Sequence, residues 1–215
     1  MIEIAPSVLA ADTLRIGEEV QRVLDAGADM LHVDIMDAHF VPNLSYGPDL
    51  CRALRRGFPD IRQDVHLMMD NPEHYIEAFA AAGANEITIH VELGEKILQA
   101  IEHIKSLGCK AGLSVKPGTP ADSLYPYLSL IDLILIMTVE PGFGGQKMMP
   151  EQLDKAAFLR EKGFCGIISA DGGIGPDNAE PAIKKGVTRL VMGTSLFRAP
   201  DAALAVAKIR ALETL

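Results

Sequence analysis

The sequence of 215 residues predicts a (β/α)8 TIM barrel, and three observations carry this prediction. An alanine-rich amphipathic stretch that ends in glycine recurs along the chain, and each time a short β-branched run follows within a few residues. Strand-like runs alternate with helical stretches, which is typical of parallel βαβ units, and eight such units suit a closed barrel better than an open sheet. Since such barrels commonly form one domain of about 200–250 residues, we expect residues 1–215 to be a single domain.

Each expected strand is an apolar run, and most follow a glycine that ends the preceding helix. In chain order the expected strands are Glu3–Leu9, Met30–Ile35 after Gly27, Arg62–Met68 after Gly57, Glu86–His90 after Gly83, Lys110–Val115 after Gly108, Ile131–Met137, Gly166–Ala170 after Gly163, and Arg189–Met192 after Gly186. Helices are expected between all of them. Two long loops, Asp37–Pro48 and Thr138–Pro150, follow strands and therefore lie at the barrel face where active sites occur.

Composition and charge restrict the partners of the chain. Hydrophobic residues make up 48% of the sequence and charged residues 23%, which provides a sizeable core. The net charge of -9 is not offset by any basic cluster, so we expect no nucleic-acid partner. The apolar run Leu133–Met137 is far shorter than the roughly 20 residues that span a bilayer, so we expect no membrane partner.

The sequence also indicates where the protein acts. The N-terminus lacks a secretion signal, so we expect a cytoplasmic protein. The three cysteines are few and far apart, so we expect them to be reduced thiols.

Two expected strands carry polar side chains on the face that points into the barrel, because residues alternate between the two faces of a strand. The inward sets are His32, Asp34 and Met36 on one strand and Asp64, His66 and Met68 on the next. A barrel interior normally holds branched apolar side chains, so histidine and aspartate there are costly unless they are paired or bind a metal.

Asp171 ends the seventh expected strand and supplies a second carboxylate at the same mouth of the barrel. His32, Asp34, His66 and Asp171 offer two nitrogens and two oxygens, a donor set suited to one Zn2+, Fe2+ or Mn2+ ion per chain. Spacing alone equally allows buried His–Asp pairs without a metal. The remaining histidines are left out of the site; His90 ends a strand and is either a core residue or a support for the metal ligands.

Glycine-rich turns follow the last three expected strands. They are Gly142-Phe143-Gly144-Gly145, Gly172-Gly173 and Gly193-Thr194-Ser195. Their free backbone N–H groups form an anion cradle where barrels commonly hold phosphate, although each glycine also suits a tight turn without a ligand. Met36, Met68 and Met137 end their strands and form either an apolar cap over a substrate or ordinary core, and Ser7 is placed to bond a substrate hydroxyl or its own turn.

Several separated motifs resemble the ribulose-phosphate 3-epimerase family over almost the whole chain. They are Ile4-Ala5-Pro6-Ser7, His32-Val33-Asp34-Ile35-Met36-Asp37, His39-Phe40-Val41-Pro42-Asn43, Asp64-Val65-His66-Leu67-Met68, Pro117-Gly118-Thr119-Pro120, Glu140-Pro141-Gly142-Phe143-Gly144-Gly145-Gln146 and Asp171-Gly172-Gly173-Ile174. The resemblance implies a ribulose-phosphate-binding barrel that interconverts D-ribulose 5-phosphate and D-xylulose 5-phosphate in the pentose phosphate pathway. It also implies a homo-oligomer.

The resemblance assigns roles to individual residues. It makes His32, Asp34, His66 and Asp171 the ligands of one divalent metal, and Asp34 and Asp171 the acid/base pair that moves the C3 proton through an enediolate. It implies that the substrate is bound by Ser7, His66, Gly142, Phe143, Gly144, Gly145, Asp171, Gly172, Gly173, Gly193 and Thr194.

Two departures from the family pattern bear on sugar preference or on the surroundings of the metal ligands, more than on the type of reaction. Ala38 stands where glycine usually follows the Met-Asp pair, and Ser169-Ala170 stands where an acidic and a small aliphatic residue are common. A 3-epimerase of a six-carbon ketose phosphate such as D-allulose 6-phosphate is therefore one alternative. A noncatalytic phosphosugar-binding barrel is the other.

Overall fold

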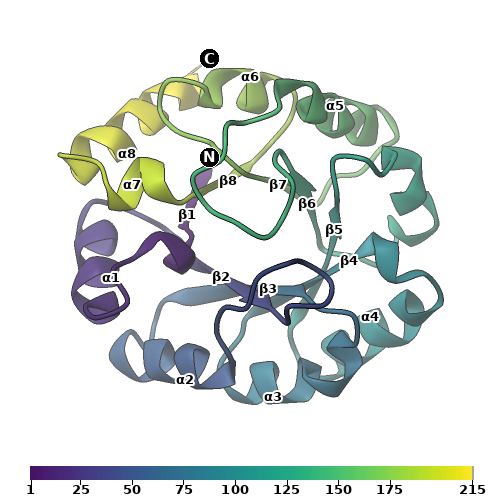
Figure 1. The fold of residues 1–215 in the computed structure, drawn as a ribbon. Coiled ribbons are helices and arrows are strands. Elements are labelled where there is room, and N and C mark those ends of the chain that lie inside the picture. The colour runs from purple at the N-terminus through teal and green to yellow at the C-terminus, as the bar shows by residue number, and fades with distance from the viewer. Residues whose placement is uncertain (215) are drawn as a thin grey trace.

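Parallel strands alternate with helices along residues 1–214, the part of the chain that the computed structural model describes (Figure 1). The strands are β1 Glu3–Pro6, β2 Met30–Met36, β3 Arg62–Met68, β4 Glu86–His90, β5 Lys110–Val115, β6 Leu133–Met137, β7 Ile167–Asp171 and β8 Arg189–Met192. They form one sheet in the order β1-β8-β7-β6-β5-β4-β3-β2, and all paired strands are parallel. The parallel bridge between Ser7 and His32 joins the two ends of this order, so the predicted (β/α)8 barrel is confirmed.

Helices surround the strands on the outside of the barrel (Figure 1). The α-helices are α1 Ile16–Asp25, α2 Pro48–Gly57, α3 Ile76–Ala81, α4 Ile97–Ser106, α5 Asp154–Glu161, α6 Ala179–Lys184, α7 Thr194–Phe197 and α8 Ala202–Ala211. Short 3-10 helices cover Val8–Ala10, Pro72–His74, Val91–Lys96, Ala121–Tyr127, Pro150–Leu153 and Leu212–Thr214. Among residues 1–214, no helix combines the length and apolar character needed to cross a membrane.

Two of the expected elements are wrong by more than the shifts of one or two residues seen at the ends of β2, β6 and β7. The first strand ends at Pro6 rather than Leu9, because the chain turns into a 3-10 helix in which Ala10 N–H donates to the Ser7 carbonyl at 3.1 Å. Between β5 and β6 the structure has the 3-10 helix Ala121–Tyr127 in place of an α-helix. Pro126 lies inside this segment and has no N–H to donate, which disfavours a continuing α-helix.

The side chains of the strands separate into two layers, as alternation predicts. Outward residues such as Val33, Ile35 and Leu67 are buried beneath the helices in the main hydrophobic cluster. Inward apolar residues form a second, smaller cluster inside the barrel: Ala5, Met30, Leu135, Met137 and Val191. The inward polar residues His32, Asp34, Asp64 and His66 share this interior and are also buried.

An ion-pair network fills the part of the interior away from the long loops. The fully buried Arg189 guanidinium contacts Glu86 Oε2 at 2.5 Å, Glu3 Oε2 at 2.8 Å and Asp64 Oδ2 at 3.4 Å. Ser169, one of the two departures from the family pattern, is the register neighbour of Arg189 in β7. The charge of Arg189 is thus neutralised by carboxylates from three other strands.

Replacing Arg189 with methionine is expected to destabilise the fold by about 3–5 kcal/mol, because the buried carboxylates of Asp64 and Glu86 would lose the fully buried cation that they share. The measurement is the free energy of unfolding from urea titration. Arg15→Met is the control, since Arg15 pairs with Asp12 on the exposed surface and its loss should leave the midpoint nearly unchanged. An Arg189→Met protein as stable as the control would contradict this interpretation of the network.

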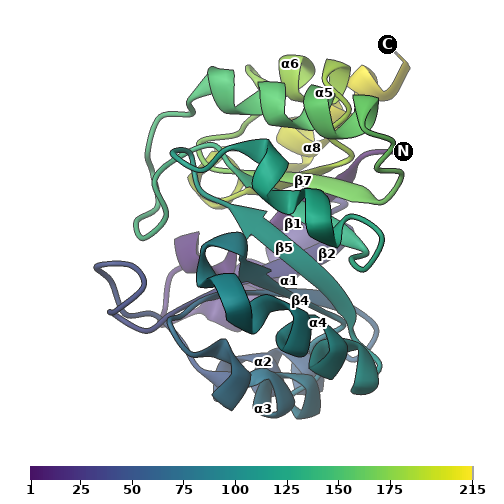
Figure 2. The same cartoon turned by 90° about the vertical axis from the view of Figure 1, so that its right-hand side faces the viewer.

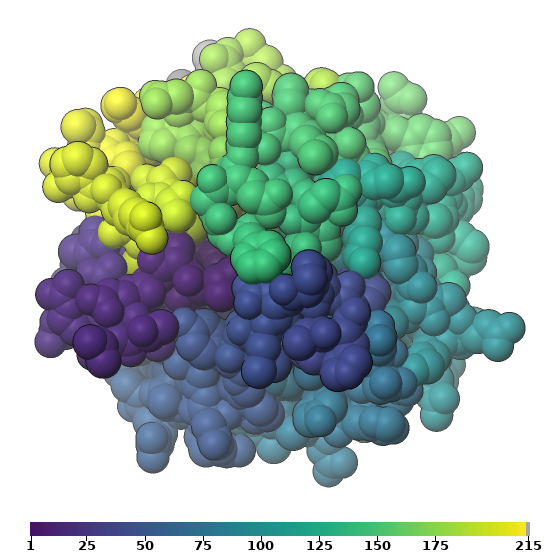
Figure 3. Space-filling model, in the orientation of Figure 1, coloured from purple at the N-terminus to yellow at the C-terminus, as the bar shows by residue number. Residues whose placement is uncertain are grey.

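The two long loops lie at one end of the barrel, and the N-terminus lies at the other (Figure 2). They are the segment between β2 and α2 and the segment between β6 and the 3-10 helix Pro150–Leu153, as expected. Seen from this end, the two segments meet over the middle of the face (Figure 3). The Asn43 side-chain amide in the first loop donates to the Gly142 carbonyl in the second at 2.7 Å, which ties them together.

Candidate active site

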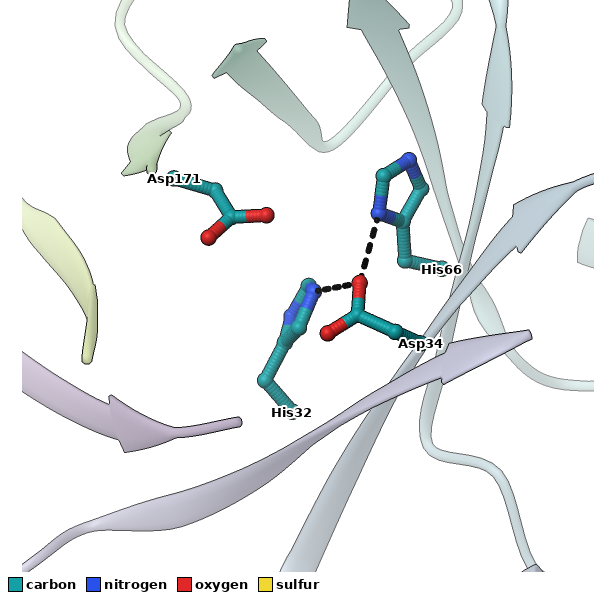
Figure 4. A group of neighbouring side chains, drawn as sticks. All are labelled: His32, Asp34, His66 and Asp171. Carbon is teal, nitrogen blue, oxygen red and sulfur yellow. Dashed lines mark hydrogen bonds and ion pairs between the residues drawn. The ribbon is translucent and has the colours of Figure 1, made fainter. Parts of the chain in front are cut away.

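Four side chains converge at the loop end of the barrel interior. His32 and Asp34 come from β2, His66 from β3 and Asp171 from the last position of β7. One possible ligand atom from each residue lies within 4.8 Å of the others. Figure 4 shows both histidines directed at Asp34, with Asp171 facing them from the opposite side of the group. The structure therefore brings together all four predicted metal ligands.

The contacts within this group fit a cation-binding site. Asp34 Oδ1 lies 3.2 Å from His32 Nε2 and also 3.2 Å from His66 Nδ1. The other ring nitrogen of His32 contacts Asp64 Oδ2 at 3.1 Å. Two imidazole nitrogens and two carboxylates lie close together, and this set of ligands can bind Zn2+, Fe2+ or Mn2+. The carboxylate behind His32 is the usual support for a histidine ligand.

The electrostatic surroundings shift the pKa values of the two carboxyl groups of the site in opposite directions. Burial alone would raise the pKa of Asp34, but the charge and hydrogen bond of His32 lead the effects that outweigh it and hold this pKa well below its ordinary value. Burial and the nearby Asp34 carboxylate raise the pKa of Asp171 to about 7. Burial would lower the pKa of His32, yet Asp34 and Asp64 raise it well above the usual range. The two carboxyl groups thus differ strongly in proton affinity.

A pocket of about 290 Å³ is lined by two of the four side chains, Asp34 and Asp171. Its lining includes the predicted residues Ser7, Asp34, Met36, Met68, Met137, Gly142, Phe143, Gly144, Gly145, Asp171, Gly172, Gly173, Gly193 and Thr194. The three methionines are almost fully buried and lie beside Asp34 and Asp171, so they give the pocket an apolar wall. Ser7 donates to Asp34 Oδ2 at 2.6 Å, a contact that the sequence did not reveal.

The glycine-rich turns after β6, β7 and β8 form one side of this pocket. Close packing explains part of their composition: a Cβ on Gly173 would lie 2.5 Å from the Met148 backbone nitrogen, and one on Gly172 would lie 2.5 Å from Val139 Cγ2. Both glycines also have positive φ. These two positions would therefore require glycine with or without a ligand, while their backbones still border the pocket.

None of the six histidines is among the residues that line the pocket, and this includes His66, which was predicted to contact the substrate. His39 and His74 are exposed and His103 is half-buried on α4, as expected for residues without a role in the site. His90 is fully buried, and its Nε2 lies 2.8 Å from His66 Nε2. Its position at the end of β4, next to the strand that carries His66, was the available signal. Ala38 has a φ of 62°, in the left-handed region that favours glycine.

The fold and the site together define a (β/α)8 barrel with a candidate metal centre beneath a glycine-lined pocket, the arrangement of a barrel enzyme for small anionic substrates. The profile of the ribulose-phosphate 3-epimerase family matches residues 3–197. The chain belongs to this family.

Curated relatives match over most of their length. Ribulose-phosphate 3-epimerase from Synechocystis sp. is 45% identical over 217 residues, which cover 97% of this chain and 93% of the relative. The cytoplasmic isoform from Oryza sativa subsp. japonica is 41% identical, with 97% of this chain and 92% of the relative covered. The chloroplastic ribulose-5-phosphate-3-epimerase of Arabidopsis thaliana is 43% identical, with 98% and 76% covered.

Solved structures with low sequence identity share the fold. KGPDC from Streptococcus mutans has a TM-score of 0.75 at 17% identity, and the match covers 100% of this chain and 98% of that one. A 3-hexulose-6-phosphate synthase has a TM-score of 0.72 at 18% identity, with 99% of both chains covered. At these identities the likeness confirms the barrel and nothing beyond it.

Proposed function

We propose that this protein is a metal-dependent 3-epimerase that interconverts D-ribulose 5-phosphate and D-xylulose 5-phosphate. The observation that carries the proposal is the placement of Asp34 and Asp171, from the non-adjacent strands β2 and β7, on two sides of one His–Asp cluster at the pocket floor. Membership of the family and the relatives named ribulose-phosphate 3-epimerase support the choice of reaction.

Epimerisation beside a ketone removes the proton from one face of the carbon and returns a proton to the other face. Two acid/base groups on opposite sides of the substrate are sufficient for this. In this proposal Asp34 takes the C3 proton on one side and Asp171 delivers one on the other, and the reverse reaction exchanges their roles. Ser7, which bonds Asp34 Oδ2, orients that carboxylate, and the methionine wall excludes water that would donate a competing proton.

His32, Asp34, His66 and Asp171 would hold the divalent ion. When bound, it supplies Lewis-acid stabilisation of the negative charge that develops on substrate oxygens during proton removal. The donor types suit Zn2+, Fe2+ and Mn2+ equally, so the identity of the ion stays open.

The phosphate end of the substrate would lie against the turns after β6, β7 and β8. Glycines provide much of this wall of the pocket, so backbone N–H groups are accessible as donors to a phosphate.

We also propose that this chain acts in the cytoplasm, as the name of the rice relative suggests for that protein. We propose further that it forms a homo-oligomer and has no nucleic-acid or membrane partner.

A coupled assay on D-ribulose 5-phosphate and D-allulose 6-phosphate, run side by side at equal concentrations, tests the proposed function. We expect kcat/KM to be higher for the five-carbon substrate. A higher kcat/KM for D-allulose 6-phosphate would contradict the proposed substrate and would identify the six-carbon sugar phosphate as the preferred one. Binding of either sugar without turnover in the metal-loaded protein would instead support the noncatalytic barrel.

A further inference from the structure

A line of three side chains runs behind the candidate metal site, from Glu92 through His90 to His66. His90 Nδ1 lies 3.1 Å from Glu92 Oε2, and His90 Nε2 lies 2.8 Å from His66 Nε2. The rings of His66 and His90 are stacked, with centroids 4.9 Å apart. His90 ends β4 and Glu92 follows in the 3-10 helix Val91–Lys96, so both lie outside the set of metal ligands.

The hydrogen bonds along these three side chains determine which ring nitrogen of each histidine carries the proton. A carboxylate only accepts hydrogen bonds, so the proton between Glu92 and His90 belongs to His90 Nδ1. A neutral imidazole that carries its proton on Nδ1 has a lone pair on Nε2. The 2.8 Å contact then requires the proton of His66 to be on its Nε2. His66 Nδ1, which faces Asp34 Oδ1 at 3.2 Å, is left with its lone pair directed into the site.

The surroundings hold the Glu92 end of this line in place. Glu92 Oε1 accepts the Lys116 backbone N–H at 2.8 Å, which fixes the carboxylate while Oε2 faces His90. Burial would raise the pKa of Glu92, but hydrogen bonds, led by that from His90, lower it to about 2.

The Phe40 ring covers His90 with centroids 4.6 Å apart, and the Lys116 ammonium lies 3.6 Å from the Phe40 centroid. Full burial and a nearby cation both disfavour a second proton on His90.

We propose that His90 and Glu92 are positioning residues that preset the tautomer of His66, so that its Nδ1 lone pair is directed toward the cation. The inference rests on the proposed metal site and deepens it. A lone pair on His66 Nδ1 beside the Asp34 carboxylate places two acceptors 3.2 Å apart, and a cation between them relieves that repulsion. Asp64 has the corresponding position behind His32.

The first test is 15N NMR of the histidine rings in the full chain, loaded with Zn2+ and after removal of the metal. We expect His66 to carry its proton on Nε2 in both forms, and His90 to carry its proton on Nδ1. A proton on His66 Nδ1 in the metal-free protein would overturn the proposal, because the metal itself would then impose the tautomer. This readout does not depend on turnover, so it is separable from the assay of the proposed function.

The second test is Glu92→Gln, followed by Zn2+ affinity in competition with a chelator. The new amide oxygen is expected to stay on the Lys116 N–H, which places the amide NH2 against His90 Nδ1 and reverses the hydrogen bonds along the line. We expect the Zn2+ affinity to fall by about 10–100-fold. In the metal-free form of the same variant, the NMR spectrum should show the proton of His66 moved to Nδ1.

Ser114→Ala is the matched control. Ser114 is the register neighbour of His90 on β5, it is fully buried, and among the described residues its Oγ has no hydrogen-bond partner. We expect wild-type Zn2+ affinity and wild-type ring tautomers in this variant. Equal affinity of Glu92→Gln and Ser114→Ala would overturn the proposal, and if Glu92→Gln does not fold, the NMR of the wild-type chain still decides it.

Discussion

Asparagine in place of Asp34 or Asp171 is expected to lower kcat by about 10²–10⁴-fold, because an amide neither accepts the C3 proton nor donates one as an acid. Each variant removes the group that works on one face of the substrate, so both should fail even though the other carboxylate remains. Steady-state assays with saturating metal give kcat and KM separately. Metal content is measured on the same samples, since an amide is also a poorer ligand.

Asp177→Asn is the control for this pair. Asp177 is a carboxylate in the turn that follows β7, a few residues beyond Asp171, and it is not among the residues that line the pocket. We expect wild-type turnover in this variant. Near wild-type turnover by Asp34→Asn or Asp171→Asn with metal bound would remove that residue from the acid/base pair.

Removal of the metal by a strong chelator is expected to lower activity by more than about 100-fold while the fold persists. The loss follows from the several kcal/mol of charge stabilisation that a divalent ion typically supplies. The fold should persist because the main hydrophobic cluster lies between the strands and the helices, separate from the site at the barrel mouth. Circular dichroism and a coupled assay on the same metal-free sample measure both properties.

Readdition of Zn2+, Fe2+ or Mn2+ completes this experiment. Recovery of activity shows that the loss came from the metal and not from irreversible damage. Full turnover by a protein verified to be metal-free would contradict the role of the metal. Unfolding after chelation would show that the ion is also needed for the barrel itself.

The sequence predicted the four convergent side chains because alternation along a strand is a strong constraint. Once Val33 and Ile35 are assigned to the outer face of β2, His32 and Asp34 must point inward, and the same reasoning places His66 on β3. The glycine that ends most of the helices located the strands that follow. A closed barrel then directs the ends of β2, β3 and β7 to one mouth.

Contacts between strands could not be predicted in this way. The bond from Ser7 to Asp34 joins the turn that ends β1 to β2, and the contact between His66 and His90 joins the neighbouring strands β3 and β4. Both distances are set by tertiary packing, which residue spacing along the chain does not encode. The 3-10 helix Ala121–Tyr127, in contrast, has a cause that is visible in the sequence, because Pro126 disfavours the α-helix that the regular alternation of strands and helices led us to expect.

The deuterium content of first-turnover product tests the two-carboxylate mechanism most directly. In D2O, the account predicts near-complete incorporation of deuterium at C3, since one carboxylate removes the original proton and the other delivers a different one. Asp171→Asn should exchange the C3 proton of one epimer with solvent without converting it to the other epimer. Substantial retention of the original proton in the first-turnover product of the wild-type enzyme would contradict the account, because a single base would then have carried that proton across the substrate.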